Sequence, residues 1–286
     1  MRQINKNIQH LFFIVACAMI VCFSGCEKVN DPYYITDPEP NVPLFADSVK
    51  KVLLEDYTGI RCPNCPEAAR TAEEIAKGSR NRVIVMAVHA GHLSQPVSPF
   101  ILDLRCPEGT AYYKDFDLSG TPKGLINRSQ KNIGIYEYSS PDWIRTVKEE
   151  MQKPITFKLK VEGTLTDKGT AINAKITYTA TETTTTDYNL LAFLVEDGIV
   201  GMQQDGGERV KDYVFHNVLR ETLHGDAYYG IPIEKPEAGV EKSIQFNNYK
   251  IKSIDKKAPN STYKLIVTIT QQNSKYIEQV EETELK

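Results

Sequence analysis

Apolar residues follow two different rhythms along the 286-residue chain. Residues 49–57 and 82–89 have continuous apolar cores, which is typical of strands buried on both faces of a sheet that helices cover. Between them, residues 66–80 are rich in helix formers, with an acidic start, a basic end and Gly78 as a stop signal. This order predicts a strand–helix–strand unit with a parallel crossover.

After Pro154 the pattern changes to alternation of apolar and polar residues. Five segments alternate in this way and are separated by Gly, Asp, Asn and Lys turns: residues 155–165, 171–181, 188–198, 242–251 and 262–272. Short strands at this spacing predict an antiparallel β-sandwich. A second helix is predicted at residues 141–152, just before the change of rhythm. We therefore expect an α/β domain at residues 48–153 and an all-β domain at residues 154–286.

The N-terminal segment has the pattern of a cleavable signal. Two basic residues precede an apolar run from Leu11 to Phe23, whose 13 residues fall short of the roughly 20 that span a bilayer. Such a run is typical of a secretory signal. Its end, Phe-Ser-Gly-Cys, resembles the bacterial lipobox, in which the cysteine is acylated and becomes the new N-terminus. We expect a lipoprotein signal at residues 1–25 and lipid attachment at Cys26; the alternative is a plain signal peptide or a short membrane anchor.

Residues 26–47 contain four prolines among acidic and polar residues, a composition that favours an extended tether. Removing residues 1–25 takes away two basic groups and no acidic group, which changes the net charge from −3 to −5. A mildly acidic chain without a basic run is a poor nucleic-acid binder, because phosphate contacts dominate such affinity. We expect no nucleic-acid partner. The lipid expected on Cys26 makes a membrane the expected partner of the N-terminus.

Two cysteines stand where the first strand gives way to the first helix, in Cys62-Pro63-Asn64-Cys65. Unpaired N–H groups and the helix dipole stabilise an anion at the first turn of a helix. A thiolate at Cys62 would therefore be favoured and its pKa lowered, which makes Cys62 the expected nucleophile and Cys65 the resolving thiol. Two thiols at this spacing are compatible with three kinds of site: a thiol–disulfide exchange site, a metal site or a structural disulfide.

Asp56 lies six residues before Cys62, within the otherwise apolar first strand. A buried carboxylate there would have a raised pKa and could accept a proton when Cys65 becomes a thiolate. The alternative is a strand-end aspartate in solvent, since Glu55 beside it is also acidic and one of the two is expected to face outward.

Thr121-Pro122 enters the short apolar stretch 124–126, and this proline is a candidate for a cis peptide bond. In a thioredoxin-type sheet such a loop packs beside the dithiol, and its backbone pairs with an extended substrate. An ordinary turn is the alternative. We take Thr121 and Pro122 as candidate substrate-binding residues.

The strand, Asp56, the Cys-x-x-Cys, the helix, the next strand and Thr121-Pro122, in that order, resemble the thioredoxin superfamily. More narrowly, "EDYTGIRCPNCP", "AVHAG", "GTPKGLINR" and "FHNVLRE" together resemble the outer-membrane-protein-28-related lipoproteins of Gram-negative gut and oral bacteria. The resemblance covers the chain from about residue 45 onward. It implies a thioredoxin-like domain followed by an immunoglobulin-like β-sandwich in an outer-membrane lipoprotein. The chain departs from the thioredoxin pattern because no tryptophan precedes Cys62 and because residues 91–117 lengthen the crossover.

Histidines offer a competing hypothesis. His89 and His92 stand at the end of the second strand, and with the two cysteines they could form a zinc or copper site. One alternative is that they line the edge of a polar cleft, and another is that His89 alone lies near the dithiol and helps to stabilise a thiolate. We predict no metal or other cofactor. His216 and His224 are expected in a structural polar cluster with Asn217 and Arg220.

Two further features have no assigned chemistry. Cys106, in the lengthened crossover, is the odd thiol; it is either a lone thiol or a third partner that captures a disulfide from the Cys62–Cys65 pair. Residues 201–209, "GMQQDGGER", contain two adjacent glycines without a following Lys-Ser/Thr, so this expected loop is not a phosphate-binding loop.

The sequence thus predicts an outer-membrane lipoprotein, on the periplasmic or the cell-surface face, that exchanges disulfides with envelope proteins. Cys62 would attack, Cys65 would resolve, Asp56 would relay a proton and the Thr121 backbone would position the partner. The alternative is a binding or adhesion module for a surface ligand, in which Cys62–Cys65 is a permanent disulfide. Zinc or copper handling is the third hypothesis.

Overall fold

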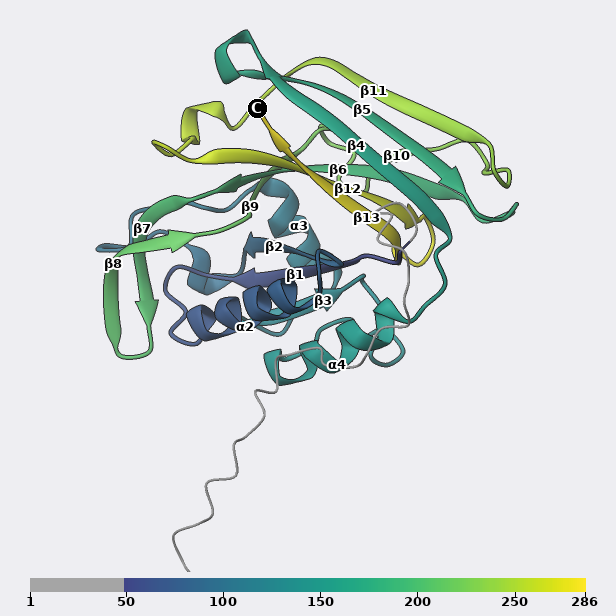
Figure 1. Ribbon diagram of the computed structural model, residues 1–286. Coiled ribbons are helices and arrows are strands. Elements are labelled where there is room, and N and C mark those ends of the chain that lie inside the picture. The colour runs from purple at the N-terminus through teal and green to yellow at the C-terminus, as the bar shows by residue number, and fades with distance from the viewer. Residues whose placement is uncertain (1–48) are drawn as a thin grey trace, which may run out of the picture. The chain divides into compact units, whose positions relative to one another are not determined.

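The computed structural model describes residues 49–286, and the predicted signal, the predicted lipid attachment at Cys26 and the predicted tether lie outside these residues (Figure 1). The first half of the described chain alternates strands with helices: β1 (Val52–Thr58), α2 (Cys65–Gly78), β2 (Val83–His89), the short 3₁₀ helix η3 (His92–Ser94), α3 (Pro107–Asp115), β3 (Lys123–Ile126) and α4 (Ser140–Met151). The predicted parallel strand–helix–strand unit is confirmed, because β1 pairs with β2 in parallel over its whole length.

The second half consists almost entirely of strands: β4 (Phe157–Thr166), β5 (Ala171–Ala180), β6 (Tyr188–Asp197), β7 (Ile199–Asp205), β8 (Glu208–Phe215), β9 (Val218–Thr222), β10 (Ile231–Pro232), β11 (Glu241–Lys250), β12 (Thr262–Gln271) and β13 (Ile277–Leu285), with short 3₁₀ turns at Asp167–Gly169 and Ile254–Lys256. All five predicted alternating segments form strands. The described fold is therefore mostly β with few helices. Within residues 49–286, no helix is long and apolar enough to span a membrane.

One eight-stranded sheet runs through both halves, in the order β13-β12-β6-β9-β2-β1-β3, with β10 added beside β6. The junction is narrow: β9 pairs in parallel with β2 at a single position, Ala87 opposite Val218. On the other side, β3 pairs with β1 antiparallel. The strand that carries Asp56 is therefore flanked by strands on both sides.

Helices cover both faces of the β1–β2–β3 part of the sheet. On one face, Val52 and Leu54 of β1 pack with apolar residues of α2 and α4, including the fully buried Trp143. On the other face, Leu53 and Tyr57 pack with α3 and with residues of β6, β12 and β13. In Figure 1, α2 and α4 lie on one side of β1 and α3 lies on the other. This arrangement explains why every residue of β1 is buried.

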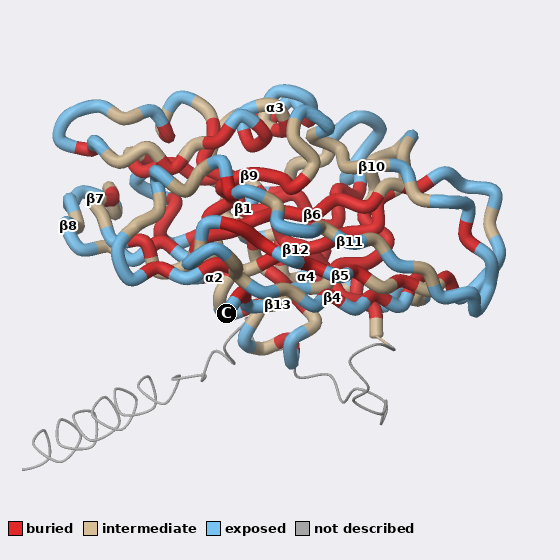
Figure 2. Tube along the Cα trace, turned by 90° about the horizontal axis from the view of Figure 1, so that it is seen from above, coloured by how far each residue is buried: buried red, intermediate tan, exposed pale blue. Residues whose placement is uncertain are grey.

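A three-stranded sheet, β11-β5-β4, packs against the other face of β6, β12 and β13. Alternate residues of β6 therefore enter two different cores, with Leu190, Ala192 and Leu194 on one side and Leu191 and Phe193 on the other. Figure 2 shows the buried chain concentrated in the middle of the view, along β1, β6, β9 and β12, with exposed stretches on β8 and β11.

The interpretation of residues 201–209 as a loop is wrong. These residues belong to a two-stranded antiparallel hairpin, β7–β8, which turns at Gly206-Gly207. Apolar residues at the base of the hairpin pack with Ile60 and with Phe100 and Leu104 of the lengthened crossover. The hairpin thus reaches from the strand-rich half to the loop that carries the cysteines.

Candidate functional site

Cys62 and Cys65 form a disulfide, with their Cα atoms 5.4 Å apart. Cys65 is the first residue of α2, and Asn64, at the N-cap, makes no side-chain bond to the first turn. The sulfur pair therefore stands at a helix N-terminus whose N–H groups no capping side chain satisfies. Each cysteine is 1% exposed, so the sulfurs are enclosed in this state of the protein.

Asp56 is also buried, at 2% exposed, and so is Glu55, at 0%. The expectation that one of these neighbours faces outward is wrong, because adjacent strand residues point to opposite faces and both faces of β1 are covered. Glu55 lies on the α3 side, where it accepts two hydrogen bonds from Arg128, at 2.8 and 2.9 Å. Asp56 lies on the α2 side, where its Oδ1 has no hydrogen-bond partner within residues 49–286. Burial raises the pKa of Asp56 to about 7.

A small cavity of about 40 Å³ brings Asp56, Cys65 and His89 together. Its wall also includes Gln203 and Tyr213 of the hairpin. The volume is sufficient for water, since one water needs roughly 10–15 Å³ on this measure. Asp56, the expected proton acceptor, and Cys65, the expected resolving cysteine, therefore line the same cavity, which is large enough to hold water.

His89 is buried at the end of β2, with its ring 5.5 Å from that of Phe215 in an edge-on arrangement. Burial lowers the pKa of His89 to about 3, so the imidazole is neutral at physiological pH. His92 is exposed on η3, and its carbonyl oxygen accepts a hydrogen bond from Arg61. Within residues 49–286, no three His, Cys, Asp or Glu side chains are grouped so as to hold a metal ion.

Thr121-Pro122 has a cis peptide bond, as the sequence predicts. The bond immediately precedes β3, whose first residue, Lys123, lies opposite Tyr57 in the β1–β3 register. Pro122 is therefore at the end of β1 from which the cysteine loop departs. Thr121 and Pro122 are partly exposed.

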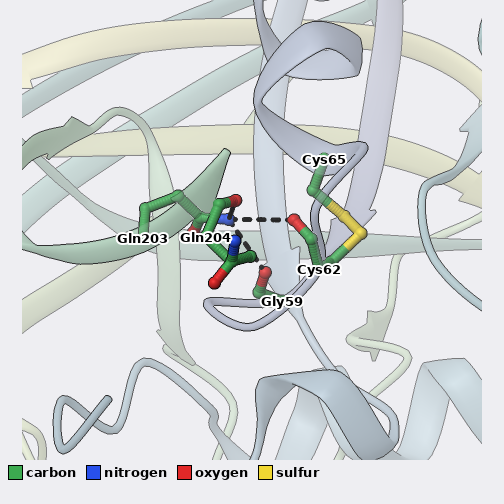
Figure 3. Close-up of a disulfide and its surroundings, with 5 residues drawn as sticks. All are labelled: Gly59, Cys62, Cys65, Gln203 and Gln204. Atoms are coloured by element: carbon green, nitrogen blue, oxygen red, sulfur yellow. Dashed lines mark hydrogen bonds between the residues drawn. A yellow bond between two sulfur atoms is a disulfide. The ribbon is translucent and has the colours of Figure 1, made fainter. Parts of the chain in front are cut away.

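The β7–β8 hairpin adds a residue that the sequence interpretation missed. Gln203 is 2% exposed, and its Nε2 donates to the carbonyl oxygen of Cys62 at 3.2 Å and to that of Gly59 at 3.3 Å. Figure 3 shows this amide against the backbone of the cysteine loop, with the sulfurs on the far side of that backbone. Gly206-Gly207, a residue pair that favours two-residue hairpin turns, is the sequence signal that could have located the hairpin.

Cys106 is a free, buried cysteine at the N-cap of α3, where its Sγ accepts a hydrogen bond from the Gly109 N–H at 3.3 Å. Burial raises the pKa of the Cys106 thiol to about 12. In this state the thiol is uncharged and enclosed, which disfavours its attack on the Cys62–Cys65 disulfide.

The expected cluster of His216, Asn217, Arg220 and His224 is only partly formed, because His216 and Asn217 share Asp197 while the other two have separate partners. Nδ1 of His216 is 3.0 Å from Oδ1 of Asp197. Nε2 of His224 instead accepts the Ala192 N–H at 2.9 Å. Arg220 pairs with the buried Glu196 at 3.2 Å. Of these four residues, His216 and Asn217 line the cavity that contains Asp56.

Comparison with known proteins identifies a family and a fold. The family model described as outer membrane protein Omp28 matches residues 109–286. Among solved structures, HBP35 of Porphyromonas gingivalis superposes with a TM-score of 0.60 at 14% identity, covering 83% of this chain and 76% of HBP35. At this identity the likeness shows a shared fold. A search of curated proteins found no match.

Two other solved structures match less closely. A protein from Agrobacterium tumefaciens superposes with a TM-score of 0.49 at 11% identity, covering 82% of this chain and 94% of its own. A domain of the outer membrane lipoprotein Omp28 from P. gingivalis matches with a TM-score of 0.30 at 13% identity, covering 46% of this chain and 88% of its own.

Proposed function

The chain belongs to the Omp28 family of outer membrane proteins, whose model matches residues 109–286, and we propose that this member exchanges disulfides with proteins of the cell envelope through Cys62 and Cys65. Family membership places the protein at the outer membrane, the location that the sequence predicts. A lipid on Cys26 holds it there in this proposal, with residues 26–47 as the tether.

The proposal assigns a thioredoxin-like domain to residues 48–153. Three features support this assignment: the β1–α2–β2 crossover with the cysteines at the start of α2, the antiparallel β3 directly after Thr121-Pro122, and α4 beside α2 on one face of the sheet. It assigns an immunoglobulin-like sandwich to residues 154–286, supported by the packing of β11-β5-β4 against β6, β12 and β13.

The position of Asp56 is the observation that carries the exchange proposal. A buried carboxyl oxygen without a hydrogen-bond partner costs stability, and a purely structural disulfide needs no such group. Asp56 shares a water-sized cavity with Cys65, and its pKa, raised to about 7 by burial, suits the transfer of a proton near neutral pH.

The exchange, in the direction that oxidises a partner dithiol, has two steps. A partner thiolate attacks Sγ of Cys62, the Cys62–Cys65 bond breaks, and Cys65 leaves as a thiolate that takes the proton of Asp56. The partner's second thiolate then attacks the partner sulfur of the mixed disulfide and releases Cys62 as a thiolate, which the helix N-terminus stabilises. Two electrons pass from the partner to the protein, and Asp56 regains a proton from water in the cavity.

The test traps the mixed disulfide in the full-length protein in its membrane. In Cys65→Ser the thiolate of Cys62 attacks a partner disulfide, which is the reverse of the second step above, and the adduct persists because the resolving thiol is missing. Cys62→Ser is the matched control, since it keeps Cys65 and Cys106. We expect adducts of envelope proteins with Cys65→Ser and none with Cys62→Ser. Adducts in neither variant, or equal adducts in both, would refute the proposal.

A binding module with a permanent disulfide is the second candidate, because Cys62 and Cys65 are each only 1% exposed. In that case the bridge would stabilise the loop before α2, and the strand-rich half would supply the binding surface. The two candidates differ in how readily the bridge is reduced, since structural disulfides resist the glutathione pool and exchanging ones do not.

A further inference from the structure

The loop that carries Cys62 is bonded along its length to the β7–β8 hairpin. We propose that Gln203 is a positioning residue, and that the hairpin contacts around it form a clamp that must release before Sγ of Cys62 can be attacked. This inference rests on the proposed exchange function. The clamp consists of four contacts: Gln203 Nε2 to Gly59 O, Gln203 Nε2 to Cys62 O, Gln204 N to Ile60 O at 2.9 Å, and Gly206 N to Pro63 O at 2.8 Å.

Gln203 is placed for this role by the regular alternation of β7, which puts it on the same face as Ile199 and Gly201. Ile199 belongs to the apolar cluster at the base of the hairpin, so this face of β7 points inward. The register shift of the hairpin inserts its extra residue on the other strand, β8, between Val210 and Tyr213. The amide is enclosed, and Nε2 also donates to the Gln204 carbonyl oxygen at 2.8 Å. The amide has two hydrogens for these three acceptors, so at least one hydrogen remains for the loop oxygens of Gly59 and Cys62.

The clamp fixes the backbone of the loop and leaves the sulfurs themselves uncovered by Gln203. In Figure 3 the disulfide lies on the opposite side of the Cys62 backbone from the amide. Because Cys62 is almost completely enclosed, an attacking thiolate needs the loop to shift outward. Any such shift breaks contacts to the hairpin. The strength of the clamp therefore controls how often Sγ of Cys62 becomes accessible to an attacking thiolate.

Two further contacts hold the hairpin in place. At its tip, Asp205 pairs with Arg70 of α2 at 3.1 Å on the surface. At its base, Gly201 fits closely against Leu102, where a Cβ would clash with the leucine side chain. The hairpin is thus anchored on both sides of Gln203, and the weaker of the two anchors is the exposed ion pair at the tip.

The experiment measures how fast dithiothreitol reduces the oxidised full-length protein, with the new thiols counted by alkylation and mass spectrometry. The key variant is Gln203→Glu, which keeps the shape of the side chain but replaces the two-hydrogen donor with a carboxyl group. When ionised this group repels the three carbonyl oxygens, and when protonated it can donate to only one of them. Reduction of Cys62–Cys65 should be faster by about tenfold or more, the factor that corresponds to losing hydrogen bonds of ordinary strength. Gln204→Glu is the matched control, because that side chain is half-buried and donates to Gly206 of the hairpin turn, while the substitution keeps the backbone N–H that bonds to Ile60; its rate should stay within about twofold of the wild type.

A second variant separates release of the clamp from general unfolding. Asp205→Asn removes the tip ion pair on the surface, and we expect a smaller acceleration of about twofold to fivefold with an unchanged midpoint of urea unfolding. If Gln203→Glu fails to fold, Asp205→Asn decides the question. Unchanged reduction rates in the folded variants, or equal acceleration by Gln204→Glu, would overturn the clamp.

The outcome is independent of the trapping experiment. Dithiothreitol needs no envelope partner, so an accelerated Gln203→Glu establishes the clamp even if Cys65→Ser captures nothing. Conversely, captured partners with an unaccelerated Gln203→Glu would keep the exchange function and remove the clamp. Failure of one proposal can therefore be told apart from failure of the other.

Discussion

Glu55 and Asp56 are neighbours in the sequence and point to opposite faces of β1, yet both carboxyl groups are buried because both faces of this strand are covered. The charge of Glu55 is matched by Arg128, which is itself fully buried and lies 4.7 Å from the centre of the Tyr112 ring. Burial opposes the charged guanidinium, but the Glu55 carboxylate outweighs this effect and raises the pKa of Arg128. One acid is thus held in a fixed ion pair, while the other is available to gain and lose a proton beside Cys65.

Arg128→Met should destabilise the protein strongly. The substitution leaves the Glu55 carboxylate buried without its partner, which costs about 3–5 kcal/mol in comparable pairs. Urea unfolding of the purified protein measures the loss. Arg145→Met is the control, since Arg145 pairs only at the surface, and its free energy of unfolding should stay close to that of the wild type. A folded Arg128→Met of wild-type stability would contradict the ion-pair assignment.

Asp56→Asn should stabilise the protein increasingly as pH rises. The pKa of Asp56 is about 7 in the folded protein and 3.8 as its ordinary value, so the folded state binds more protons than the unfolded state between these values. Wild-type stability is therefore lost as pH rises through about 7, and the asparagine does not incur this loss. The difference between variant and wild type should grow from pH 4 and level off above pH 7 at on the order of 4 kcal/mol.

Urea unfolding at pH 4, 5.5 and 8 checks this prediction. Asp212→Asn is the matched control because Asp212 is exposed on β8, and its effect should not vary with pH. A constant difference between Asp56→Asn and the wild type across this range would mean that Asp56 does not titrate in a buried site.

Much of this fold is predictable from sequence, because its determinants are local. The continuous apolar runs of β1 and β2 and the alternation in β4, β5, β6, β11 and β12 give the strands directly. The Cys-x-x-Cys at a strand–helix junction and the proline before β3 give the candidate dithiol and its neighbouring loop. These features depend on residue order along single elements, and the structure retains them.

The clamp and the shared cavity depend instead on contacts between distant segments. Residues 199–215 contain few consecutive apolar residues, and the hairpin is held by Ile60, Leu102 and the cysteine loop. Nothing local indicates that Gln203 meets Cys62, which lies 141 positions away. The two-sided burial of Glu55 and Asp56 likewise follows only when α3 and residues of the strand-rich half are known to cover the second face of β1.

His224→Gln should make the protein more resistant to acid. The imidazole accepts the Ala192 N–H, and burial lowers its pKa to about 4 from an ordinary 6.5. The unfolded state then binds more protons between these values, so wild-type stability falls as pH drops from 6.5 towards 4. Glutamine can accept the same bond without titrating, which should spare on the order of 2–3 kcal/mol at pH 4.

The measurement is the urea midpoint at pH 7.5 and at pH 4. His92→Gln serves as the control, since His92 is exposed, and it should follow the wild type at both values. If His224→Gln loses as much stability in acid as the wild type does, His224 is not held neutral by its surroundings.

Cys106 should be inert in the folded protein. With its pKa raised to about 12 by burial, only roughly one thiol in ten thousand is ionised at pH 8, and the side chain is enclosed. Iodoacetamide at pH 8 should leave Cys106 unmodified in buffer and modify it fully in urea, as intact-protein mass spectrometry would show. Rapid modification in buffer would instead support a role for Cys106 as a third thiol of the exchange site.

The most direct test of the account is the reduction potential of the Cys62–Cys65 pair, obtained by equilibrating the full-length protein with glutathione buffers and counting free thiols. An exchanging pair at a helix N-terminus should have a potential between about −270 and −180 mV, the range of thioredoxin and protein disulfide isomerase. A potential below about −300 mV, the range of structural disulfides that resist glutathione, would contradict exchange and favour the binding module.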